Sequence, residues 1–150
     1  MTCTAPVALA ADRAAFAIGG QSQVARMSIN AATVALTRGP TTTINFATGA
    51  SCVAIHPDGS RLYVAASGAP AGFIQVFSVD GAGALTATSQ VPAGHGRICI
   101  AVDAGGEFMY VTNSSDNAVS TYSISQGGGA LTLLEQDPTG TFPQAIALTP

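Results

Sequence analysis

The chain has 150 residues and a formal net charge of −3, with 47% hydrophobic and only 9% charged residues. All basic residues are arginines scattered along the sequence, which excludes the basic stripe of a nucleic-acid-binding surface. No run of about 18 apolar residues is present, so no membrane-spanning helix is predicted. A short apolar segment, residues 5–11, could be a signal-peptide core or a β-strand. Because no basic residue precedes it, a strand is favoured.

The sequence repeats itself with a period of about 46 residues. Each copy contains four short runs rich in Val, Ile, Tyr, Phe and Thr, separated by Gly, Pro and Asp, which is the pattern of four β-strands joined by turns. In chain order, complete copies are predicted over approximately 5–47, 48–92 and 93–138, and a fourth copy begins within 139–150.

The copies differ in how clearly they show the pattern. The first is the weakest, and its strands are expected at residues 7–9, 15–18, 24–29 and 34–37. The second contains the turn Pro57-Asp58-Gly59, in which proline presets φ and glycine accepts a positive φ. The third repeats the series from Ile100 onward, and the fourth supplies a single strand at Ala145–Leu148.

The first run of each copy is apolar on both faces. Val53 and Ile55 point to one face, and the small residues that alternate with them point to the other. Such a strand must be covered on both sides, which four-stranded units achieve by stacking face to face around a ring. An ordinary β-sandwich would instead alternate apolar and polar residues without a fixed period. The prediction is an all-β protein: about three four-stranded antiparallel blades of a larger β-propeller.

Three blades do not close a ring, because propellers typically contain four to eight. Two explanations remain open: a longer polypeptide supplies the remaining blades, or a second copy of the chain completes the ring. The surplus strand at residues 146–148 has no vacant place in a symmetric dimer. The expected partner is therefore the rest of a longer chain, with a second copy as the alternative.

Two of the three cysteines, Cys52 and Cys99, occupy equivalent positions of the repeat. This suggests small buried fillers on matching strands, with a disulfide between them as the open alternative. No second ligand pair accompanies them and no nucleotide-binding loop is present, so the sequence predicts no metal and no cofactor. So few cysteines favour a cytoplasmic location over a secreted or periplasmic one.

The segment Tyr110–Asn113 reads Tyr-Val-Thr-Asn, the signature that names the YVTN repeat. With the Pro-Asp-Gly turn before Tyr63 and the Gly-Ala-Leu-Thr endings, it makes the chain resemble the lactonase-like seven-bladed β-propeller superfamily, strongly over 48–150 and weakly over 1–47. That group includes 6-phosphogluconolactonase-type enzymes, muconate-lactonizing relatives and bacterial YVTN surface proteins. The resemblance implies that this chain is part of a seven-bladed ring.

For the enzymes of this group, the resemblance implies a histidine and an arginine near the start of an inner strand, and a glutamate just after Tyr-Val-x-Asn. Here His95 and Arg97 flank a glycine before an inner strand, and Ser114 stands where the glutamate is expected. Intact blade motifs beside altered site motifs favour a binding or interaction scaffold. The alternative is a sugar-lactone hydrolase of the 6-phosphogluconolactonase type with its site at the channel mouth.

The alternating direction of consecutive strands indicates which loops could form a site. The loops that enter each inner strand and those between the second and third strands share one face of the ring. His95 and Arg97 are the candidate catalytic residues there: arginine suits an anionic group, and a neutral histidine can act as general base toward water attacking a small sugar lactone. Asn113 and Asp116 are the candidate ligand-binding residues.

Each assignment has a structural alternative. His95 and Arg97 could be solvated loop residues, and Asn113 and Asp116 could bond their own turn. On the opposite face, His56 is expected to flank the Pro-Asp-Gly turn, without a role in a site.

Overall fold

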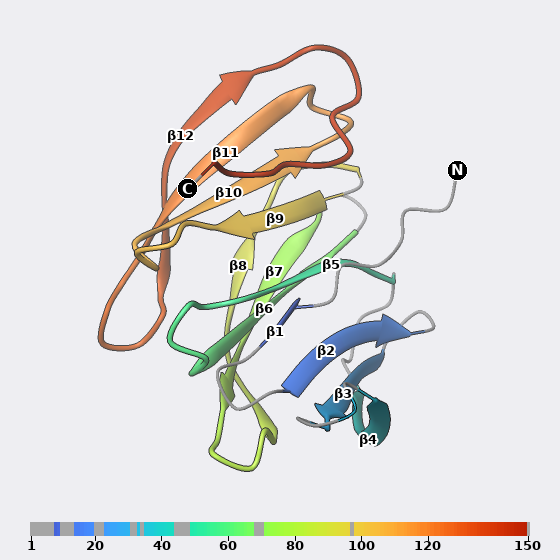
Figure 1. Cartoon of the computed structure of the whole chain (residues 1–150). Helices are drawn as coiled ribbons and strands as arrows, with labels where there is room; N and C mark the ends of the chain where they lie inside the picture. Colours follow the sequence, from blue (N-terminus) through green and yellow to red (C-terminus); the bar gives the residue numbers. More distant parts are fainter. Residues whose placement is uncertain are drawn as a thin grey trace.

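The computed structural model describes twelve strands that form three four-stranded antiparallel sheets, without a helix among the described residues (Figure 1). The predicted all-β architecture of four-stranded blades is confirmed. The described residues contain no helix that could span a lipid bilayer. The structure describes residues 8–9, 14–19, 23–30, 33, 35–43, 49–67, 71–96 and 98–149.

Each sheet is an antiparallel meander in which strands adjacent in sequence pair with one another. The first blade contains β1 (Ala8–Leu9), β2 (Ala14–Gly19), β3 (Gln23–Ile29) and β4 (Leu36–Thr43). The second blade contains β5 (Ala50–Ile55), β6 (Arg61–Ala66), β7 (Phe73–Val79) and β8 (Leu85–Pro92). The third blade contains β9 (Ile98–Val102), β10 (Phe108–Asn113), β11 (Ala118–Ile124) and β12 (Leu131–Pro138).

The first and fourth copies depart from the expected strands. In the first blade, β4 extends to Thr43, well beyond the predicted end at residue 37. Val7 and Val34, which were expected in strands, lie outside the described residues. The predicted strand at 145–148 is not formed, although Ile146 lies beside Cys99 of β9. In each described blade the inner strand pairs with the second strand of its own blade, and residues 139–149 contain no second run that could pair in this way.

The second blade is buried on both faces because the side chains of β6 alternate between two cores. Leu62 and Val64 pack with Phe16 of the first blade, whereas Tyr63 packs with Met109 of the third. The outermost strands β4, β8 and β12 are largely exposed. Burial between consecutive sheets is the packing that the repeat predicted.

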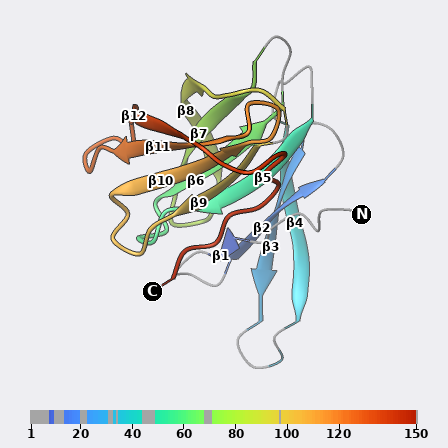
Figure 2. The ribbon, with the colours of Figure 1, turned by 90° about the horizontal axis from the view of Figure 1, so that it is seen from above.

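The inner strands lie next to one another, as Figure 2 shows from above. Ser51 Oγ on β5 donates to the carbonyl oxygen of Ile98 on β9 at 2.7 Å. One residue further along both strands, the Sγ atoms of Cys52 and Cys99 are 3.0 Å apart. The two cysteines occupy matching positions on matching strands, as predicted, but only Cys52 is buried and Cys99 is partly exposed.

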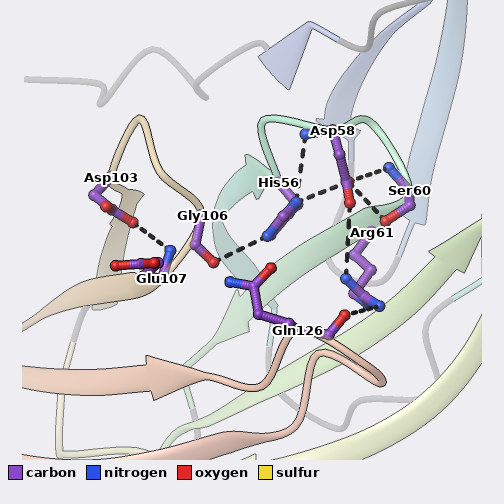
Figure 3. Close-up of polar contacts among 8 residues, drawn as sticks. All are labelled: His56, Asp58, Ser60, Arg61, Asp103, Gly106, Glu107 and Gln126. Atoms are coloured by element: carbon purple, nitrogen blue, oxygen red, sulfur yellow. Dashed lines mark hydrogen bonds and ion pairs between the residues drawn. The ribbon is translucent and has the colours of Figure 1, made fainter.

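A polar network joins the second and third blades at the turn between β5 and β6 (Figure 3). His56 is only 5% exposed, and its Nε2 lies 3.0 Å from the carbonyl oxygen of Gly106 in the third blade. Its Nδ1 lies 2.7 Å from Asp58 Oδ1, which also accepts hydrogen bonds from the backbone and side chain of Ser60. Gly59 has φ of 75°, as the turn sequence predicts. His56 is thus a turn-flanking residue that also connects two blades.

Candidate functional site

The candidate site is formed by two loops that meet on the ring face opposite the His56 network: residues 93–96, which follow β8, and residues 114–117 between β10 and β11. Ser115 N donates to the carbonyl oxygen of His95 at 3.1 Å, so the two loops are directly hydrogen-bonded. The sequence-based prediction that these two kinds of loop share a face is confirmed.

Two glycines on either side of His95 make this close approach possible. A Cβ on Gly94 would collide with the side chains of Asn113 and Asp116. Gly96 has φ of 91°, a conformation that glycine adopts readily, and a Cβ there would collide with Ser115. The glycine–histidine–glycine sequence therefore allows the His95 loop to pack closely against the loop of residues 114–117.

His95 and Asp116 form a hydrogen-bonded pair. His95 Nδ1 lies 3.0 Å from Asp116 Oδ1, and the backbone N–H of His95 donates to Oδ2 at 2.7 Å. The imidazole side chain is 55% exposed and the carboxylate 29%. A carboxylate beside Nδ1 favours the tautomer with its proton on Nδ1, which leaves the lone pair on Nε2. Within the described part of the chain, no hydrogen bond engages His95 Nε2.

Asn113 helps to hold the loop that carries His95 in place. Its side chain is fully buried, and Oδ1 accepts a hydrogen bond from Gly94 N at 3.1 Å. At the other end of the amide, Nδ2 donates to Ser120 Oγ at 2.8 Å. Asn113 thus connects the His95 loop to β11. Ser114, where the family resemblance leads one to expect a glutamate, is also fully buried.

An open hollow of about 460 Å³ lies beside the pair. Its size falls within the range of small-molecule sites. The described lining combines an imidazole, a carboxylate and an amide with two apolar residues; its members are His95, Asp116, Ala118, Gln136 and Pro138. The hollow therefore lies over the outer strands β11 and β12, whereas the sequence led us to expect a ligand at the channel mouth, around the inner strands.

Of the predicted site residues, the structure brings His95, Asn113 and Asp116 together, and Arg97 lies outside the described residues. Sequence reasoning missed Gln136 and Pro138, because the face to which β12 residues point depends on its pairing with β11. That register includes an irregularity between Thr121 and Tyr122, which no feature of the sequence predicts. The glycines flanking His95 were the one available signal of the close loop contact.

Comparisons with known proteins identify the family. The family model "Lactonase, 7-bladed beta-propeller" matches residues 14–108 and 99–150. No curated protein sequence matches the chain. Three solved structures illustrate the structural similarity.

A protein of Bacteroides uniformis, described as a candidate 6-phosphogluconolactonase, aligns with a TM-score of 0.83 and 18% identity over 96% of this chain and 43% of its own. A Lactobacillus plantarum protein aligns with a TM-score of 0.78 and 26% identity over 91% and 42% of the two chains. The periplasmic gluconolactonase PpgL of Pseudomonas aeruginosa aligns with a TM-score of 0.77 and 21% identity over 91% of this chain and 40% of its own.

The chain thus spans less than half the length of each of these structures. The family model, in contrast, covers almost all of this chain, from residue 14 to its end. On that match, the chain belongs to the seven-bladed β-propeller lactonase family.

Proposed function

We propose that the protein hydrolyses a sugar lactone, a cyclic carboxylic ester, with His95 as the general base. The observation that carries this proposal is the His95–Asp116 pair beside an open hollow of about 460 Å³. Family membership supports the reaction class, because the matching family model describes lactonases. The general base of such a reaction needs an unprotonated ring nitrogen accessible to water, and in the neutral imidazole the pairing of Nδ1 with Asp116 favours the tautomer that leaves Nε2 unprotonated.

The reaction follows from these groups. His95 Nε2 removes a proton from a water molecule as its oxygen attacks the lactone carbonyl. Asp116 holds the Nδ1 proton and stabilises the imidazolium that forms, the role that a carboxylate has in other histidine-based hydrolases. The tetrahedral intermediate then expels the ring oxygen, which takes the proton from Nε2. The product is the open-chain hydroxy acid.

The remaining residues have proposed roles in binding and positioning. Gln136 lines the hollow, and its amide can bond the hydroxyl groups of a sugar. Arg97, two residues after His95, is proposed to anchor an anionic group such as a substrate phosphate, because a guanidinium binds phosphate through two parallel hydrogen bonds. Asn113 is proposed to act through His95, by holding its loop on β11.

The test is hydrolysis of gluconolactone and 6-phosphogluconolactone, monitored as the release of acid above the rate of spontaneous hydrolysis. We expect His95→Ala to lower kcat by about 10²–10⁴-fold, the usual contribution of a general base. Asp116→Asn should lower kcat less, because the imidazolium that forms in the reaction loses a neighbouring negative charge. Asp137→Asn, an exposed carboxylate on β12, is the matched control and should leave turnover unchanged.

A second function, a non-catalytic binding scaffold, is favoured by a different observation. The position after Asn113 holds Ser114, which is fully buried and carries no carboxylate. Turnover that is unaffected by His95→Ala and Asp116→Asn would remove the proposed site. Absence of turnover on both lactones, in a protein that folds, would favour the scaffold.

A further inference from the structure

The inner strands carry a second pair of reactive groups, remote from the loop face and unused by the proposed hydrolysis. The Sγ atoms of Cys52 on β5 and Cys99 on β9 are 3.0 Å apart. A disulfide bond is about 2.05 Å long, so closure requires the sulfurs to approach by roughly 1 Å. These two residues belong to different blades and are 47 positions apart in the chain.

The strands around the two sulfurs are already fixed against each other. Ser51 Oγ donates to the Ile98 carbonyl at 2.7 Å on one side of the pair, and Ile100 N donates to Cys52 Sγ at 3.2 Å on the other. The two strands are therefore held together on both sides of the sulfur pair.

We propose that Cys52 and Cys99 are a modification site: they form a reversible disulfide that covalently joins the inner strands of the second and third blades. The oxidant is a low-molecular-weight disulfide such as oxidised glutathione. This proposal does not depend on the lactonase proposal, because neither cysteine lines the hollow.

The two sulfurs divide the roles of a thiol–disulfide exchange. Cys52 is 1% exposed, whereas Cys99 is partly exposed, so Cys99 is the sulfur that a soluble reagent meets first. The hydrogen bond from the Cys52 thiol lowers the pKa of Cys99, and the backbone of Ile146 adds to this effect. That same hydrogen bond, together with burial, raises the pKa of Cys52. Cys99 is thus the thiol that ionises more readily and attacks the oxidant, and Cys52 is the resolving thiol, which then attacks the mixed disulfide on Cys99.

The reaction balances in two steps. The Cys99 thiolate attacks one sulfur of the oxidised reagent, forms a mixed disulfide and releases one thiolate. Cys52 then attacks the Cys99 sulfur, and the half of the reagent that was bound to Cys99 leaves as a thiol with the proton from Cys52. The two protein sulfurs lose two electrons, and the reagent disulfide gains them as it becomes two thiols.

The consequence is a redox-dependent stability. A disulfide that closes a loop of this length restricts the unfolded chain strongly, and the near-contact of the sulfurs limits strain in the native state. We expect the oxidised protein to melt about 5–10 °C higher than the reduced protein. Reduction by dithiothreitol should reverse the shift.

The experiment uses the protein with Cys3→Ser, which removes the one other thiol of the sequence. It is equilibrated with oxidised and reduced glutathione, quenched with acid, alkylated under denaturing conditions and digested for peptide mass spectrometry. The expected result is a single linked peptide pair containing Cys52 and Cys99, with both thiols lost together. Cys52→Ala and Cys99→Ala, each in the same background, should abolish the oxidation-dependent melting shift.

Two results would overturn the proposal. One is full alkylation of both cysteines after equilibration with excess oxidised glutathione. The other is a stable glutathione adduct on Cys99 with Cys52 still free, which would show that the second step does not occur. A link between Cys99 residues of two molecules would equally count against it.

Discussion

The two histidines of this chain each have an aspartate beside Nδ1, yet the two pairs lie in opposite environments. His56 is 5% exposed and has Asp58 at 2.7 Å and the Gly106 carbonyl of the next blade at 3.0 Å, so both ring nitrogens are engaged by the protein (Figure 3). His95 is 55% exposed, with Asp116 at 3.0 Å. Similar chemistry therefore supports a connection between blades on one face and an accessible base on the other.

The difference follows from the position of each histidine in the blade. His56 follows an inner strand directly and is covered by the turn of the neighbouring blade that contains Gly106. His95 lies in the connection between two blades, where nothing in the described part of the chain covers the imidazole from outside. Burial, rather than the aspartate, distinguishes a structural histidine from a candidate functional one. The predictions below test this distinction.

The largest expected effect on stability comes from removing the buried histidine. His56→Ala should lower the free energy of unfolding by about 2–4 kcal/mol, because it leaves a cavity and deprives the Gly106 carbonyl of its partner. His95→Ala should change it by about 0.5 kcal/mol or less, since the side chain is exposed. Urea denaturation of both variants measures the contrast, and equal losses would contradict the assigned roles.

A second comparison tests the contact from the Gly106 side. Gly106 has φ of 69°, and an added Cβ would collide with the His56 ring. Gly106→Ala should therefore cost about 1–3 kcal/mol, from backbone strain and from displacement of the ring. Gly127→Ala is the matched control, because no atom lies within 4 Å of its added Cβ. Thermal or urea unfolding should show the control within about 0.5 kcal/mol of the parent protein.

The smallest effect is a dependence of stability on pH. Burial acts to raise the pKa of Asp58, but hydrogen bonds from Ser60 and the contact with His56 outweigh it and lower the pKa from 3.8 to about 2. The folded protein thus binds this proton less readily than the unfolded chain. The resulting stabilisation is present above about pH 4 and is lost as the pH falls toward 2.

Asp58→Asn should remove this part of the pH dependence. Because the Asp58 side chain is 52% exposed, solvent screening keeps the difference under about 1 kcal/mol. Unfolding free energies at pH 5 and pH 3 give the comparison, with Asp137→Asn as an exposed control. If the Asp58→Asn variant lost as much stability between these pH values as the parent protein, the prediction would be contradicted.

Most of the fold could be predicted from the sequence, because each blade is a local unit. The turn at Gly59 and the apolar alternation of each run depend on residues within a few positions of one another. The copies that departed from expectation are the first, whose turn sequence is altered, and the last. Residues 145–148 read as a strand but form none, since a strand also requires a partner with which to pair.

The sequence by itself determined the repeat, the four-stranded antiparallel blades and the shared face of the two site loops, because short-range patterns and strand alternation are sufficient for these. Only the tertiary structure decided that Asp116 pairs with His95 across 21 positions, that His56 is buried against a residue 50 positions away, and that Cys52 meets Cys99. These contacts join separate turns, loops and blades. Their distances arise from how the sheets pack against one another, which no local pattern encodes.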